Sequence, residues 1–149
     1  MTHGLLYSLI SVLTITLSVY PGLCFKASFG FMKDVPNALN WTLIMIQIIF
    51  NGFDTVGRYM GGIKPFSLPI KAINTGAALR VLFVPTFLAV ALKWPPSYIF
   101  DTDWFKMTNI VLVAFSNGYI STLCGTKAPE TVQTEEQRAS VGSYIGLCI

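Results

Sequence analysis

The sequence predicts an all-α protein: a polytopic transmembrane helix bundle with about four full spans and a truncated fifth. Three observations support this fold class. First, 53% of the 149 residues are hydrophobic and only 11% are charged, whereas an average soluble domain has about 25% charged residues to cover its surface. Second, apolar stretches of about 20 residues, the length of a helix that crosses a bilayer, follow one another along the chain. Third, short polar links containing Pro, Gly and Lys separate them.

The first expected span covers residues 4–25. Ser and Thr recur along it, and both are tolerated in lipid because their hydroxyls bond the helix backbone or a neighbouring helix. A signal peptide is the alternative interpretation, but no Lys or Arg precedes the apolar stretch and no small-residue cleavage site follows it. We therefore favour a retained helix, which Pro21 and Gly22 bend or end.

The second expected span covers residues 39–62. Trp41 lies at its start, where an amphipathic indole suits the membrane interface, and Gly61 and Gly62 end it. Gly57 and Gly61 form a GxxxG step, the spacing that lets two helices approach closely.

The third expected span covers residues 72–92. Pro85 lies inside it and is expected to kink it, because proline removes one backbone hydrogen bond. The fourth covers residues 105–124, and a polar link follows it from residue 125 onward. A partial fifth helix is expected over residues 132–149, whose apolar part is only about half the length that a bilayer requires.

Several function classes find no support in the composition. The net charge of +3 is spread along the chain without a basic cluster, so no nucleic acid is expected as a partner. The single histidine and the three cysteines, none in a CxxC pair, predict no metal site. No phosphate-binding glycine loop, nucleophile elbow or HExxH motif is present, so we expect neither an enzyme nor a cofactor.

Polar residues inside the second span are the first candidates for function, since charges in a membrane are costly. Asn51, Asp54 and Arg58 follow an i, i+3, i+7 spacing that places them on one helix face. Asp54 and Arg58 can form an i, i+4 ion pair, and a carboxylate beside a guanidinium could bind a polyhydroxylated ligand. Alternatively, Arg58 extends to the interface and Asp54 only compensates its charge. Asp54 is too short to extend in this way, so we favour the functional interpretation.

Five further residues are candidates for a cavity wall or a gate. Arg80 is either an interfacial arginine or a gate and inter-helix tie. Asn117, which a glycine follows, marks tight helix packing or a cavity wall, and packing is favoured. Tyr20 and Pro21 form either the rim of a pocket or a helix terminus. Gln47, four residues before Asn51, completes the set.

At these residues the chain resembles a known family. Phe50–Arg58 resembles the FN-x-x-D-x-x-G-R signature of equilibrative nucleoside transporters, solute carrier family 29. Further stretches resemble other helices of that family in the same order: Thr16–Pro21 the end of the seventh, Arg80–Pro85 the ninth, Phe115–Tyr119 the tenth and Ala128–Pro129 the link into the eleventh. The resemblance covers nearly the whole chain.

The resemblance implies a fold and a function. The family has a six-helix and a five-helix bundle arranged like a major-facilitator fold, and residues 1–149 would form its C-terminal bundle, helices seven to ten and the first half of eleven. The implied function is facilitative, alternating-access transport of nucleosides, with nucleobases as a variant. Asp54 and Arg58 would hold the ribose, Asn51 would support them, and Tyr20 and Pro21 would lie at the extracellular end of the cavity.

The resemblance also implies partners. Besides the nucleoside and the lipid bilayer, we expect a missing N-terminal six-helix half or a larger membrane assembly, and the shortened last helix favours an incomplete gene model. The plasma membrane is favoured over an organelle membrane. The alternative is a transport-inactive accessory or structural subunit of a larger membrane complex. Met1, directly before the first helix, fits that alternative as a genuine start.

Overall fold

The computed structural model describes residues 2–18, 20, 29–92, 102–131 and 134–148. Within these ranges the regular elements are all helices, which confirms the all-α class. The elements are α1 (Thr2–Ser18), η3 (Gly30–Met32), α2 (Ala38–Gly62), η4 (Lys64–Phe66), α3 (Ile70–Leu79), η5 (Arg80–Leu82), α4 (Phe83–Leu92), α6 (Asp103–Glu130) and α7 (Glu135–Cys148).

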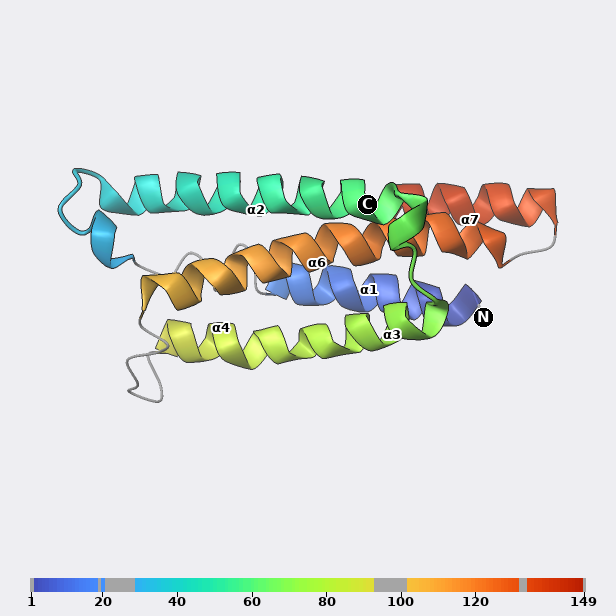
Figure 1. The fold of residues 1–149 in the computed structure, drawn as a ribbon, viewed down its shortest axis with the longest axis horizontal. Helices are drawn as coiled ribbons and strands as arrows, with labels where there is room; N and C mark the ends of the chain where they lie inside the picture. Colours follow the sequence, from blue (N-terminus) through green and yellow to red (C-terminus); the bar gives the residue numbers. More distant parts are fainter. Residues whose placement is uncertain (1, 19, 21–28, 93–101, 132–133, 149) are drawn as a thin grey trace.

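The long helices lie side by side in an elongated bundle (Figure 1). α6 and α1 run between α2 on one side and the α3–α4 pair on the other, and α7 lies beside the C-terminal part of α6. α6 contacts α1, α2, α3, α4 and α7. It is therefore the helix around which the described part of the bundle is built.

Two helical stretches of the described residues are long and apolar enough to cross a membrane, Ile70–Leu92 and Asp103–Glu130, and Tyr7–Ser18 is a shorter apolar helix. α2 has 25 residues, a length of about 37 Å at the usual helical rise. Asn, Gln and charged side chains interrupt its apolar stretch. Polar side chains at membrane depth need an environment other than lipid.

The third expected span is a continuous helical stretch interrupted by a 3-10 turn. α3 ends at Leu79, η5 covers Arg80–Leu82 and α4 resumes at Phe83. Pro85 explains this position, because its ring cannot donate to the carbonyl of residue 81 and clashes with it in a regular α-helix. The irregularity expected from Pro85 therefore takes the form of a tighter turn just before it.

The fourth expected span is longer than the sequence predicts. The polar link expected from residue 125 is wrong, because α6 remains helical through Glu130. Ala128 is buried against α1, and this burial stabilises the extra turn, whose end is closed by a bond from the Thr131 N–H to the Ala128 carbonyl. The first span is described only to Ser18 and Tyr20, so its predicted end at residue 25 lies outside the described residues.

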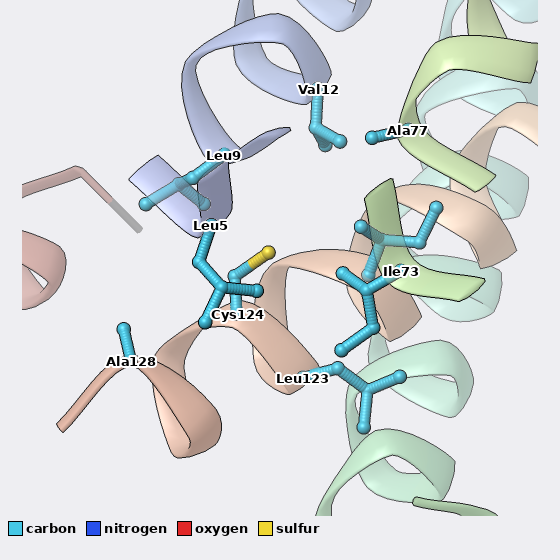
Figure 2. Close-up of a cluster of buried hydrophobic side chains, with 9 residues drawn as sticks. Leu5, Leu9, Val12, Ile73, Ala77, Leu123, Cys124 and Ala128 are labelled. Atoms are coloured by element: carbon cyan, nitrogen blue, oxygen red, sulfur yellow. The ribbon is translucent and has the colours of Figure 1, made fainter. Parts of the chain in front are cut away.

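Two apolar clusters form the core. Figure 2 shows the first, in which side chains of α1, α3 and α6 point toward one another, and Cys124 lies buried in it. The second cluster lies further along the same helices and adds α2 and α4. The first contains Leu5, Leu9, Val12, Ile73, Ala77, Ile120, Leu123, Cys124 and Ala128, and the second contains Ile15, Phe29, Ile46, Phe50, Phe87, Ile110, Val113 and Ala114.

Glycines set the distance between α2 and α6. A Cβ on Gly57 would overlap the backbone carbonyl of Phe115, and a Cβ on Gly118 would overlap that of Asp54. Gly61 also lies close to α6, because a Cβ built on it would be 2.9 Å from the Tyr119 carbonyl oxygen. The close approach predicted from the GxxxG step is confirmed, and its partner is α6.

Candidate functional site

A layer of polar side chains lies where the two apolar clusters meet. On α1 it follows Val12 and Ile15, and on α6 it lies between Ala114 and Ile120. Four elements contribute to it: α1, α2, η5 and α6. We call this set the polar layer; its members are Thr16, Asp54, Arg58, Arg80 and Asn117.

Asp54 and Arg58 form the ion pair that their i, i+4 spacing predicts. The Nε of Arg58 donates to Oδ2 of Asp54 at 2.7 Å. The Arg58 side chain is 37% exposed and that of Asp54 is 14% exposed. The pair therefore lies at the edge of the described bundle, and Arg58 is the more accessible of the two groups.

Asn117 holds the second oxygen of the same carboxylate. Its Nδ2 donates to Oδ1 of Asp54 at 2.7 Å, across the α2–α6 crossing. An ionised carboxylate accepts hydrogen bonds only, so the amide must present its NH₂ group here. Its Oδ1 then faces the Thr16 hydroxyl, 2.7 Å away.

Arg80 ends the layer on the other side. Its Nη2 donates to the Thr16 Oγ1 at 2.8 Å. Of the two interpretations of Arg80 from the sequence, burial favours the inter-helix tie, since only 1% of the residue is exposed and it lies at the middle of the stretch Ile70–Leu92. The bond to Thr16 ties η5 to α1.

The layer carries three formal charges, two guanidinium groups and one carboxylate, in an apolar surrounding. Buried charges are costly unless they are paired and hydrogen-bonded. Both oxygens of Asp54 are bonded, but Nε and Nη1 of Arg80 have no hydrogen-bond partner among the described residues. A buried arginine with two unpaired donors costs stability, so its presence calls for an explanation.

The other candidates lie around this layer. Asn51 is exposed on α2, and within the described ranges no hydrogen bond joins its side chain to Asp54 or Arg58. Gln47 accepts a hydrogen bond from the Tyr20 hydroxyl. The Tyr20 ring also stacks on Phe50, with ring centroids 4.1 Å apart. Tyr20 and Gln47 thus join the end of the first span to α2, whereas Pro21 lies outside the described residues.

A separate cavity of about 410 Å³ lies near the start of α6, away from the polar layer. The carboxylate of Asp103 borders it and accepts from the backbone N–H groups of Gly30 and Phe31. These bonds attach η3 to α6. Across the described residues, no three His, Cys, Asp or Glu side chains come together as a metal-binding group.

Sequence reasoning missed Thr16 as a member of the site. It was one of several Ser and Thr residues that are tolerated in lipid, and nothing local distinguishes it. Its place directly after the apolar Ile15 is the only signal in the sequence. The contact with Asn117 that makes it part of the site is visible only in the structure.

A helical bundle with candidate membrane spans and a charged layer within it is typical of integral membrane transport proteins. The chain belongs to the nucleoside transporter family, whose model matches residues 3–146. The family that the Phe50–Arg58 signature predicts is therefore confirmed.

Individual relatives carry consistent names. The chain is 27% identical over 141 residues to Nucleoside transporter 1.2 of Leishmania donovani, covering 91% of this chain and 26% of the relative. It is 28% identical over 142 residues to human Equilibrative nucleoside transporter 1, covering 89% of this chain and 30% of the relative. It is 28% identical over 137 residues to Equilibrative nucleotide transporter 7 of Arabidopsis thaliana, covering 91% of this chain and 30% of the relative. The chain thus spans less than a third of the length of these relatives. No solved structure matches it.

Proposed function

We propose that this chain supplies the C-terminal half of a facilitative transporter that carries nucleosides, with nucleobases as a variant, by alternating access. In this proposal α1, α2, the α3–α4 stretch and α6 are four spans of a major-facilitator-like fold. The N-terminal six-helix half, or a larger membrane assembly, is the partner, and the plasma membrane is the location. Membership of the nucleoside transporter family supports the substrate class.

The observation that carries the proposal is the position of the Asp54–Arg58 pair. It lies at the level of the mid-span residues Arg80 and Asn117, to which hydrogen bonds connect it, and Arg58 is its more accessible group. Transporters of this kind bind their solute near the bilayer midplane, between two bundles. A partly exposed ion pair at this depth fits a wall of such a site.

The chemistry of the pair fits a ribose. Among the described residues, each oxygen of Asp54 has one hydrogen bond and keeps a further lone pair that can accept from a sugar hydroxyl. Arg58 uses its Nε for Asp54, which leaves its two terminal nitrogens to donate to hydroxyl oxygens. In the proposal Asp54 and Arg58 bind the 2′ and 3′ hydroxyls. Asn51 contacts the solute beside them, and Tyr20, Pro21 and Gln47 border the outer end of the cavity.

The test is uptake by the full native polypeptide that contains this chain, expressed in cells without nucleoside transport. Uptake of adenosine is compared with uptake of 2′,3′-dideoxyadenosine, and the ratio of the two reports recognition of the hydroxyls. We expect Asp54→Ala to lower this ratio by about tenfold or more, the scale of one hydrogen bond to a charged group. The matched control is Asp34→Asn, a change at an exposed aspartate outside α2.

Unchanged adenosine uptake in Asp54→Ala would contradict the proposal. The alternative, a transport-inactive accessory subunit, would then gain support, since that role makes no use of the carboxylate.

A further inference from the structure

The carboxylate of Asp54 is fixed from two helices. Arg58, on its own helix, holds Oδ2, and Asn117, on α6, holds Oδ1. Two hydrogen bonds to different oxygens define the plane of a carboxylate, whereas one bond leaves it free to rotate about its terminal torsion. Asn117 therefore decides in which direction the free lone pairs of Asp54 point.

Asn117 is in turn fixed by Thr16. The Thr16 hydroxyl has one proton and two acceptors within reach, the Val12 carbonyl and Oδ1 of Asn117, both at 2.7 Å. It can donate to only one of them at a time. Donation to Asn117 completes a set of bonds that all run toward Asp54, and in such a chain each bond polarises the next.

Arg80 starts this chain of bonds. It donates to the oxygen of Thr16, and at 1% exposure it is too deeply buried to touch a solute. Packing does not explain it, because two of its nitrogens have no partner within the described ranges. Its hydrogen bond to the layer is the one to Thr16, and its positive charge also interacts with the Asp54 carboxylate.

We infer that Asn117, Thr16 and Arg80 are positioning residues that orient the Asp54 carboxylate for recognition of sugar hydroxyls. The inference rests on the proposed function and adds three residues that do not touch the solute. It makes ribose recognition at α2 dependent on the placement of α6, α1 and η5. It also explains why a polar layer, rather than a continuous apolar core, joins these four elements.

The first test variant is Asn117→Ala. It removes the donor to Asp54, while the Thr16 hydroxyl keeps the Val12 carbonyl as an acceptor, so no buried hydroxyl loses its partner. We expect the adenosine to dideoxyadenosine uptake ratio to fall about tenfold, the scale of one charge-assisted hydrogen bond. Uptake of the dideoxynucleoside should change much less. Asn109→Ala is the matched control, since Asn109 is buried on the same helix but bonds its own backbone at Phe105.

The second test pair is Thr16→Val and Thr16→Ser. Valine matches the shape of threonine without the hydroxyl, and we expect the same loss of the ratio, whereas serine keeps the hydroxyl and should restore it. Thr86→Val is the control, because the Thr86 hydroxyl bonds the Phe83 carbonyl of its own helix. In the Asp54→Ala background, Asn117→Ala should cause no further fall in the ratio, since coupled residues are not additive.

The outcomes separate the two proposals. If Asp54→Ala lowers the ratio and neither Asn117→Ala nor Thr16→Val does, the positioning role is wrong and the proposed function stands. If Asp54→Ala leaves the ratio unchanged, the proposed function itself is wrong. An equal loss of uptake of both solutes, or the loss of surface protein in both variants, would assign a structural role to these residues and overturn the positioning role.

Discussion

Arg58 is the residue of the polar layer whose geometry leaves donors free on the exposed side. It gives its Nε to Asp54, and its side chain is more than a third exposed. A guanidinium is a planar fork that can bond a carboxylate and a second acceptor at once, whereas an ammonium is a single point charge. The geometry of the site therefore depends on arginine and not simply on a positive charge at position 58.

This dependence gives a prediction for Arg58→Lys. The ammonium would pair with Asp54 and leave no fixed donors for the solute, so we expect the adenosine to dideoxyadenosine uptake ratio to fall about tenfold. Arg138→Lys, at an exposed arginine of α7, is the matched control and should retain the ratio. Equal ratios in the two variants would mean that position 58 needs only a charge.

The same residues show what the sequence can predict of the site. The Asp54–Arg58 pair was predictable because both residues lie on one helix, four positions apart. The bonds from Asn117 to Asp54 and from Thr16 to Asn117 join residues 63 and 101 positions apart. The spacing of residues within one helix says nothing about pairs so far apart in sequence. These contacts therefore follow only from the way in which the helices pack. The predicted binding roles of Asn51, Asp54 and Arg58 remain proposals.

At the scale of the helices, the α2–α6 crossing is the contact on which the site depends. The glycines of this crossing bring the two backbones together; Asn117 directly precedes Gly118, and Asp54 lies about one helical turn before Gly57. We expect Gly118→Ala to destabilise the protein by roughly 1–3 kcal/mol, the usual cost of overpacking, because its Cβ would overlap the Asp54 carbonyl. The measurement is the melting temperature of the detergent-solubilised protein.

Gly52→Ala is the control for this change. Gly52 lies on α2, and a Cβ built on it meets nothing within 4 Å. Because alanine is the better helix former by about 1 kcal/mol, Gly52→Ala should leave the melting temperature unchanged or raise it. A melting temperature for Gly118→Ala as high as that for Gly52→Ala would show that the backbones do not approach as closely as described.

Some helix boundaries follow from local signals in the sequence, and others depend on long-range contacts. The sequence predicts residues 39–62 for the second span and α2 covers Ala38–Gly62, because glycines end the apolar pattern there. The end of α6 was not predictable in this way. Its last turn contains polar residues and Pro129, and it stays helical because Ala128 packs against α1, a contact that no local pattern shows.

At the scale of the whole molecule, two surfaces of opposite character are exposed. On the α3–η5–α4 stretch the exposed side chains are large and apolar, among them Leu79, Val81, Leu82 and Leu88, and lipid is the solvent that suits them. α2 exposes large apolar side chains too, but one stripe along it presents Gln47, Asn51 and Arg58. Polar side chains at membrane depth face protein or a water-filled cavity. The proposed two-bundle transporter places this face toward the other half.

Cysteine accessibility tests this assignment of the two surfaces. In the full polypeptide with its native cysteines replaced, we expect Gln47→Cys and Asn51→Cys to react with a water-soluble thiol reagent, and adenosine to slow the reaction at position 51. Leu82→Cys and Leu88→Cys should stay unreactive, because a thiol that faces lipid is rarely ionised and the charged reagent does not enter the hydrocarbon. If the α2 positions were unreactive and the α4 side reactive, the cavity would lie on the opposite face of the bundle. The Asp54–Arg58 pair would then have to act as a structural tie between helices.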